Sequence, residues 1–93
     1  MVVASQTWEL ALPGCASLKA KRSVIRSLRD RLRSRFNVSV AETGLQDVHG
    51  RALLSIAAVG SDRRWVESVL EKADRLVESH GEAIIVRVDR EIH

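Results

Sequence analysis

Hydrophobic and polar residues alternate near both ends of the chain, and this pattern predicts a strand at each end. Within residues 2–12 the apolar side chains fall mostly at even positions, with Gln6 as the exception. A period of two is typical of a half-buried strand. A similar pattern over residues 83–92 predicts a final strand. One of its faces is expected to carry Ile84, Val86, Val88 and Ile92.

Two segments have helical periodicity instead. From Leu18 to Phe36 the apolar residues recur every three or four positions, and Ser17 is a suitable N-cap. A second helix is expected to begin after Gly60-Ser61-Asp62 and to close at His80-Gly81. Its apolar stripe is formed by Trp65, Val66, Val69, Leu70, Ala73, Leu76 and Val77.

Two further strands lie between these helices, at residues 37–43 and 51–59, with a glycine-bounded loop at 44–50. The order of elements is therefore β-α-β-β-α-β. This order predicts an α+β protein with a ferredoxin-like sandwich, in which two helices cover one face of a four-stranded antiparallel sheet. Right-handed crossovers favour the strand order 4-1-3-2. Residues 1–93 are expected to form a single domain.

The composition is that of an ordinary soluble chain, with 45% hydrophobic and 29% charged residues. No apolar run approaches the length that spans a bilayer, and no basic leader precedes the first apolar residues. The one cysteine, Cys15, cannot form an internal disulfide, which suits a reducing compartment. We therefore expect a cytoplasmic protein. The net charge of +3 is less informative about function than the distribution of the charges along the chain.

Basic residues are concentrated on the first helix. Residues 17–36 contain eight of them and a single acid, Asp30, whereas the second helix mixes both signs and spaces Glu71 and Arg75 as an i,i+4 pair. Five of the cations fall within an arc of about 80° beside the apolar stripe. We call these five the basic ridge: Lys19, Arg22, Arg26, Arg29 and Arg33.

Two interpretations of the basic ridge follow. Cations at the start of a helix interact unfavourably with its dipole, so their presence there suggests a function outside the helix. The ridge, with Lys21 near the helix start, suits the phosphate backbone of a nucleic acid, most naturally structured RNA. Alternatively it is a solvated helix face, paired with Asp89, Glu91 or another subunit. The sequence leaves both open.

Three motifs carry a resemblance to a known family. Leu12 to Ser23 (LPGCASLKAKRS), Arg35 to Glu42 (RFNVSVAE) and Gln46 to Ala52 (QDVHGRA) together resemble the YlxP-like family of small bacterial proteins of unknown function. The resemblance implies a ferredoxin-like fold and no established catalytic residues. The genes of that family tend to lie beside genes for translation initiation and ribosome maturation, which implies a ribosome- or RNA-associated role.

The chain departs from that family at two positions. Ala20 stands where the family often has Glu, so the helix lacks the acid of a capping box. His49 replaces a large aromatic residue in the loop. Gln46 and Asp47 of the same loop are expected to bond the turn backbone, with contact to a partner as the alternative.

No set of residues suggests an enzyme, a metal site or a bound cofactor. Cys15 lies beside cations at a helix start, but no second soft ligand is near it in sequence. His49, His80 and His93 lack ligand spacing and are expected at the surface. We therefore expect a non-enzymatic protein.

The open face of the sheet supports an alternative function. Trp8 and Trp65 are both expected in the core, so base stacking on sheet aromatics is not favoured. Apolar residues on that face would instead suit a protein-interaction or small-ligand regulatory module that forms homodimers through its sheet. The residues expected there are Val3, Leu53, Val59 and Ile85.

Overall fold

The computed structural model describes all 93 residues and contains four strands and two helices in the expected order. The elements are β1 (Val2–Ala11), α1 (Leu18–Arg35), β2 (Val38–Gly44), β3 (Arg51–Gly60), α2 (Arg63–Glu78) and β4 (Ile84–Ile92).

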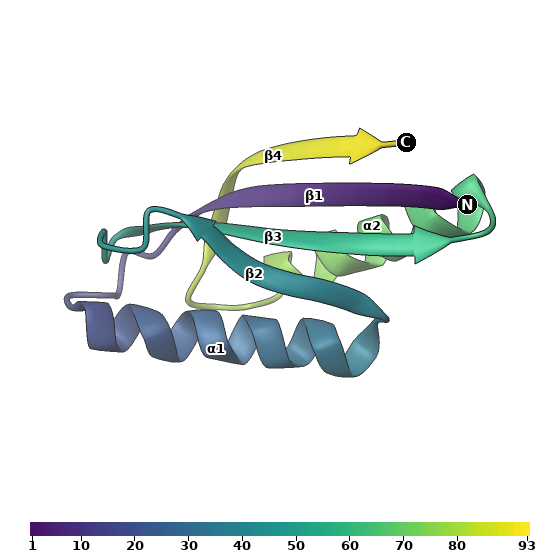
Figure 1. Cartoon of the computed structure of the whole chain (residues 1–93). Coiled ribbons are helices and arrows are strands. Elements are labelled where there is room, and N and C mark those ends of the chain that lie inside the picture. Colours follow the sequence, from purple (N-terminus) through teal and green to yellow (C-terminus); the bar gives the residue numbers. More distant parts are fainter.

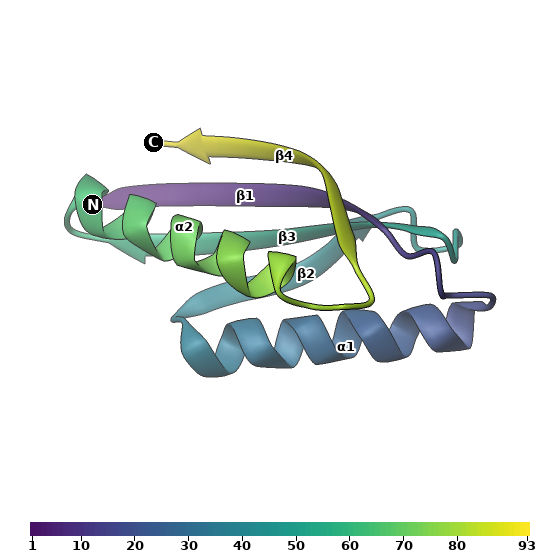
Figure 2. The same ribbon diagram turned by 180° about the vertical axis from the view of Figure 1, so that it is seen from behind.

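The strands form one antiparallel sheet in the order β2-β3-β1-β4, with both helices on one face (Figure 1). The ferredoxin-like βαββαβ prediction and its strand order are therefore confirmed. From behind, α2 crosses the middle of the sheet, whereas α1 runs along the β2 edge, farthest from β4 (Figure 2). The chain ends meet at one end of the sheet, where Val3 and His93 exchange backbone hydrogen bonds of 3.1 and 2.8 Å.

Each helix begins after a residue whose side chain caps its first turn. Ser17 Oγ accepts from the backbone N–H of Ala20 at 3.1 Å, and Asp62 Oδ1 accepts from that of Arg64 at 3.2 Å. The predicted glycine closure of α2 is wrong, because Gly81 does not adopt a positive φ. Ser79 ends the helix instead, and its N–H donates to the carbonyl of Arg75.

The core lies between the helices and the covered face of the sheet. Even-numbered residues of β1 and β3 supply one side of it, and the apolar stripes of both helices supply the other. Trp8 is fully buried, as predicted. Trp65 is 50% exposed, so its predicted core position is wrong. It lies in the first turn of α2 beside Gly60, where a Cβ would come within 3.0 Å of its ring, so the ring covers backbone rather than entering the core.

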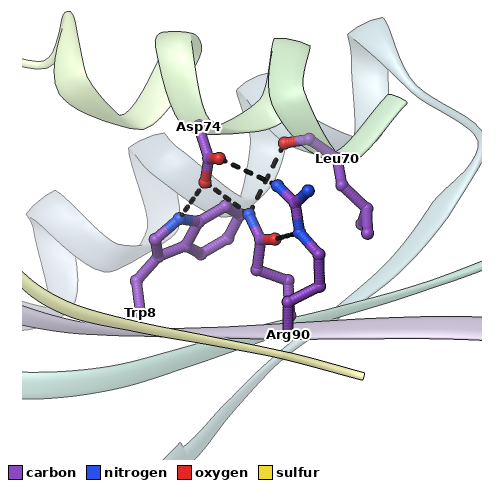
Figure 3. A network of polar contacts seen from close by, with 5 residues as sticks. Trp8, Leu70, Asp74 and Arg90 are labelled. Carbon is purple, nitrogen blue, oxygen red and sulfur yellow. Dashed lines mark hydrogen bonds and ion pairs between the residues drawn. The ribbon is translucent and has the colours of Figure 1, made fainter. Parts of the chain in front are cut away.

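Gln6, the polar residue among the apolar even positions of β1, is completely buried and bonds to Asp74 of α2. Asp74 is the centre of a polar network that also includes Trp8 and Arg90 (Figure 3). Trp8 Nε1–H donates to Asp74 Oδ1 at 2.7 Å, and the amide nitrogen of Gln6 donates to the same oxygen. Arg90 of β4 donates to Gln6 Oε1 at 2.6 Å and to Asp74 Oδ2 at 3.2 Å. One carboxylate thus satisfies two buried donors and ties β1, β4 and α2 together.

An extra residue in β4 changes the face assigned to Ile85. Glu9 pairs with Arg87 while Leu10 pairs with Ile85, so Val86 forms a bulge. Residues directly opposite each other share a face, so Ile85 lies with Leu10 on the helix-covered side, where it packs against the core. Its predicted place on the open face is therefore wrong. The bulge also means that, contrary to the prediction, Ile84, Val86, Val88 and Ile92 do not share one face of the last strand.

Removing the carboxylate at the centre of the network should destabilise the fold. In Asp74→Ala, the indole N–H of Trp8 loses its acceptor, the Gln6 amide keeps only a bond of 3.5 Å to the carbonyl of Leu70, and Arg90 loses its ion pair, a cost of about 3 kcal/mol. Urea unfolding measures this loss. Glu71→Ala is the matched control, because Glu71 is exposed on the same helix and should change stability by less than about 0.5 kcal/mol. Equal losses in both variants would show that the network does not stabilise the fold.

Candidate functional site

The basic ridge follows the outer side of α1 along the β2 edge of the molecule. Lys19, Arg22, Arg26 and Arg33 are exposed, and Arg29 is half-exposed. Arg33 Nη2 donates to the carbonyl of Val40 at 3.4 Å, which places this end of the ridge beside β2. From Lys19 to Arg33 the ridge extends about 21 Å at 1.5 Å per residue.

The ridge is almost free of acidic partners. Arg29 Nε lies 3.6 Å from Asp30 Oδ1, and no other ridge residue takes part in an ion pair. The partners considered from sequence are engaged elsewhere, since Asp89 pairs with Arg87 and Glu91 lies 3.5 Å from the ring of His93. The ridge is therefore not neutralised by β4.

Lys21 does not belong to this surface. Its side chain is buried, and its ammonium donates to the carbonyls of Leu45 and Val48 at 2.6 and 2.7 Å. It also lies 2.9 Å from Glu42 Oε2, in an ion pair rather than an aligned hydrogen bond. The ammonium is fully used inside the protein, so the prediction that Lys21 contacts nucleic acid is wrong.

The helical spacing contained a signal for this burial. Lys21 precedes Val24 by three residues, Ile25 by four and Leu28 by seven, so it continues the apolar stripe. A long side chain can bury its methylene stem there if its charge finds partners. Those partners come from the β2–β3 loop, which the helix pattern alone does not place.

Lys21 is at the centre of a junction that joins the three sequence motifs at the end of the sheet opposite the termini. His49 Nδ1 lies 2.9 Å from the carbonyl of Cys15, which links the β2–β3 loop to the β1–α1 loop. Gln46 Nε2 donates to the carbonyl of Glu42 at 3.3 Å, in agreement with its predicted turn role. Leu45, with φ of 57°, is the one non-glycine residue with positive φ. This junction holds the start of α1, and with it the ridge.

His49 and His93 are exposed, as predicted, whereas His80 and Cys15 are buried. Cys15 is 6% exposed and packs in the core. His80 is buried, contrary to its predicted surface position, and its Nδ1 accepts from the N–H of Glu82 at 3.3 Å. No group of three His, Cys, Asp or Glu side chains lies together in a way that could hold a metal ion.

The open face of the sheet is more polar than predicted. Val59 is 55% exposed and Leu53 is half-buried, but hydroxyls occupy the middle of the face. Ser55 Oγ lies 2.7 Å from the hydroxyls of both Thr7 and Thr43, across three strands. Arg51 pairs with Glu9 at 3.2 Å beside them. Val3 and Val59 are cross-strand partners, but the hydroxyls of Thr7 and Ser55 separate them from Leu53, so the predicted apolar residues do not form one continuous patch.

The chain belongs to the family described as "Protein of unknown function (DUF503)", whose model matches residues 3–90. It is 36% identical over 74 residues to the "Uncharacterized protein YlxP" of Bacillus subtilis (strain 168), a match that covers 80% of each chain. The predicted membership of a YlxP-like family of unknown function is thereby confirmed.

Among solved structures, a C-terminal segment of the alpha subunit of aIF2 from Pyrococcus abyssi matches with a TM-score of 0.47 and 19% identity. The match covers 99% of this chain and 48% of that chain. Neither helix of the present structure is long and apolar enough to cross a membrane.

Removing the buried ammonium should cost more than removing a ridge charge. In Lys21→Met the stem is kept, but the carbonyls of Leu45 and Val48 lose their donor and Glu42 loses its counterion. We expect the free energy of unfolding to fall by about 3 kcal/mol. Urea unfolding measures the change, with Lys19→Met as the exposed control at less than about 0.5 kcal/mol. A neutral Lys21→Met variant would contradict the anchoring role.

Proposed function

We propose that this protein is a cytoplasmic, non-enzymatic accessory factor that associates with RNA or the ribosome and binds the phosphate backbone through the basic ridge. The observation that carries the proposal is the line of five cations on α1, exposed or half-exposed, with only one acidic neighbour. Arginine and lysine on such a surface contact phosphates without reading base sequence.

The physical cost of the ridge supports a use for it. Like charges at i,i+4 spacing destabilise a helix by a few tenths of a kcal/mol per pair, and Lys19 and Arg22 lie where the helix dipole is positive. The ridge has no internal ion-pair network to offset these terms. On α2, by comparison, Arg63 pairs with Glu67 at 3.0 Å. A phosphate backbone would supply the missing counter-charge.

The proposed mechanism is electrostatic. Each phosphate neutralised by a ridge residue releases condensed counterions into solution, so affinity falls as salt rises. Because α1 is held at its start by Lys21 and along its length by its apolar stripe, the cations are presented on a rigid element. A rigid line of charge suits a folded RNA of fixed shape better than a disordered segment would.

Reversing two ridge charges tests the proposal. Arg22 and Arg26 are the best positions, because both are exposed and unpaired, whereas Arg29 lies beside Asp30. In Arg22→Glu/Arg26→Glu, we expect affinity for structured ribosomal RNA to fall for all sequences alike. The slope of log K against log salt should become shallower by about 1.5, from the loss of two phosphate contacts. Fluorescence anisotropy across a salt series measures both quantities.

The matched control reverses the same number of charges on α2. Arg63→Glu/Arg64→Glu changes the net charge equally but lies at the start of the other helix, away from the ridge. This control should lose much less affinity than the ridge variant. Equal losses would mean that only net charge matters, and an unchanged ridge variant would refute the proposal.

The alternative is a regulatory module that dimerises through the open face of its sheet. Leu53 and Val59 remain its predicted interface residues, whereas Ile85 no longer belongs to that face. A continuous apolar patch would favour it, and hydroxyls with the Arg51–Glu9 pair interrupt this one. Sedimentation equilibrium is the measurement. A dimer that is lost in Leu53→Lys, together with no salt-dependent RNA affinity, would replace the ridge proposal with this one.

A further inference from the structure

A second group of cations lies on the opposite side of α1 from the ridge. Arg31 and Arg35 are about 160° round the helix from the ridge centre, on the flank that faces α2. There they meet Lys72 and Arg75 of α2 around an open pocket between the C-terminal parts of the two helices. This juxtaposition could not be predicted from the sequence, because the two pairs are about forty residues apart and only packing brings them together.

The pocket has the dimensions of a small-ligand site. Its main part has a volume of about 380 Å³, within the range of such sites, and Phe36 and Leu76 are its apolar lining residues. A neighbouring hollow of about 160 Å³ shares Arg35 and reaches Arg31. The lining combines four positive side chains with two apolar residues and contains no acid.

These four cations have no partners in the protein. None of them forms an ion pair with a carboxylate, and none donates a side-chain hydrogen bond. The i,i+4 pair expected between Glu71 and Arg75 is absent from the structure, so Arg75 remains available to the pocket. The hydroxyls of Ser34 and Ser79 donate to helix carbonyls, at 3.1 and 2.7 Å, so the cations dominate the electrostatics of the site.

The helix dipoles account for only part of this arrangement. Cations in the last turn of a helix interact favourably with its negative end, which explains Arg35 and Arg75. The effect fades beyond the last turn, and Arg31 and Lys72 lie before it. Four like charges around one hollow also repel each other. A bound anion would relieve that repulsion.

We propose that this pocket between α1 and α2 binds a small anion carrying two or more linked phosphates. Two linked phosphates carry a charge of about −3 at pH 7, which four cations can neutralise. Arginine binds phosphate oxygens in bidentate fashion, and Arg35 and Arg75 approach the pocket from different helices, so one diphosphate can be held from two sides. The proposal does not depend on RNA binding, because the ridge lies on the other flank of α1.

Isothermal titration calorimetry with inorganic pyrophosphate tests this site in the intact protein. We expect saturable one-to-one binding that sulfate at equal ionic strength does not reproduce. In Arg35→Gln/Arg75→Gln, affinity should fall about 100-fold, or about tenfold for each arginine removed. The control Arg63→Gln/Arg64→Gln removes the same charge from the start of α2, outside both the ridge and the pocket lining, and should stay within about twofold of the wild type.

A third variant guards against a folding artefact, because Arg35 and Arg75 also interact with the helix ends. Lys72→Gln lies before the last turn, and it should weaken pyrophosphate binding about tenfold without lowering the melting temperature. No saturable binding by the wild type would overturn the proposal. Equal losses in the pocket variant and the α2-start control would also overturn it, since pyrophosphate would then respond to net charge alone.

Discussion

The buried ammonium of Lys21 is the interaction that holds together the end of the sheet opposite the termini. A lysine in an apolar stripe is tolerated only when its charge is satisfied, and here two carbonyls of the β2–β3 loop and the Glu42 carboxylate do so. The loop is in turn joined to the β1–α1 loop through His49 and Cys15. The three motifs that define the family resemblance therefore meet at one structural junction. Their shared role is to fix the start of α1.

The Asp74 network has the same logic at the other helix. Gln6 and Trp8 bring two polar donors into the core, and a single carboxylate on α2 receives both while pairing with Arg90 of β4. Because each helix is tied to the sheet by a polar anchor as well as by apolar packing, its angular position is specified. The direction in which each cation points depends on this angular position of its helix.

The two helices thus divide the positive charge into separate surfaces. Packing α1 along the β2 edge leaves one flank open to solvent as the ridge and turns the other flank, with Arg31 and Arg35, toward α2. An extended line of cations suits a polymer with many phosphates, whereas a hollow surrounded by four cations suits a compact anion. One helix can carry both because its buried stripe separates them.

The sequence by itself determined the order of elements, the sheet topology, the cap at Ser17 and the line of the ridge, because these depend on local periodicity and on general rules of chain connection. It could also have placed Lys21 in the apolar stripe. Tertiary structure alone decided the rest. The bulge at Val86 reversed the face of Ile85, the exposure of Trp65 followed from its position beside Gly60, and the Glu71–Arg75 spacing produced no ion pair. The four-cation pocket likewise required the packing of α1 against α2, since contacts between residues distant in the chain depend on how whole elements fit together.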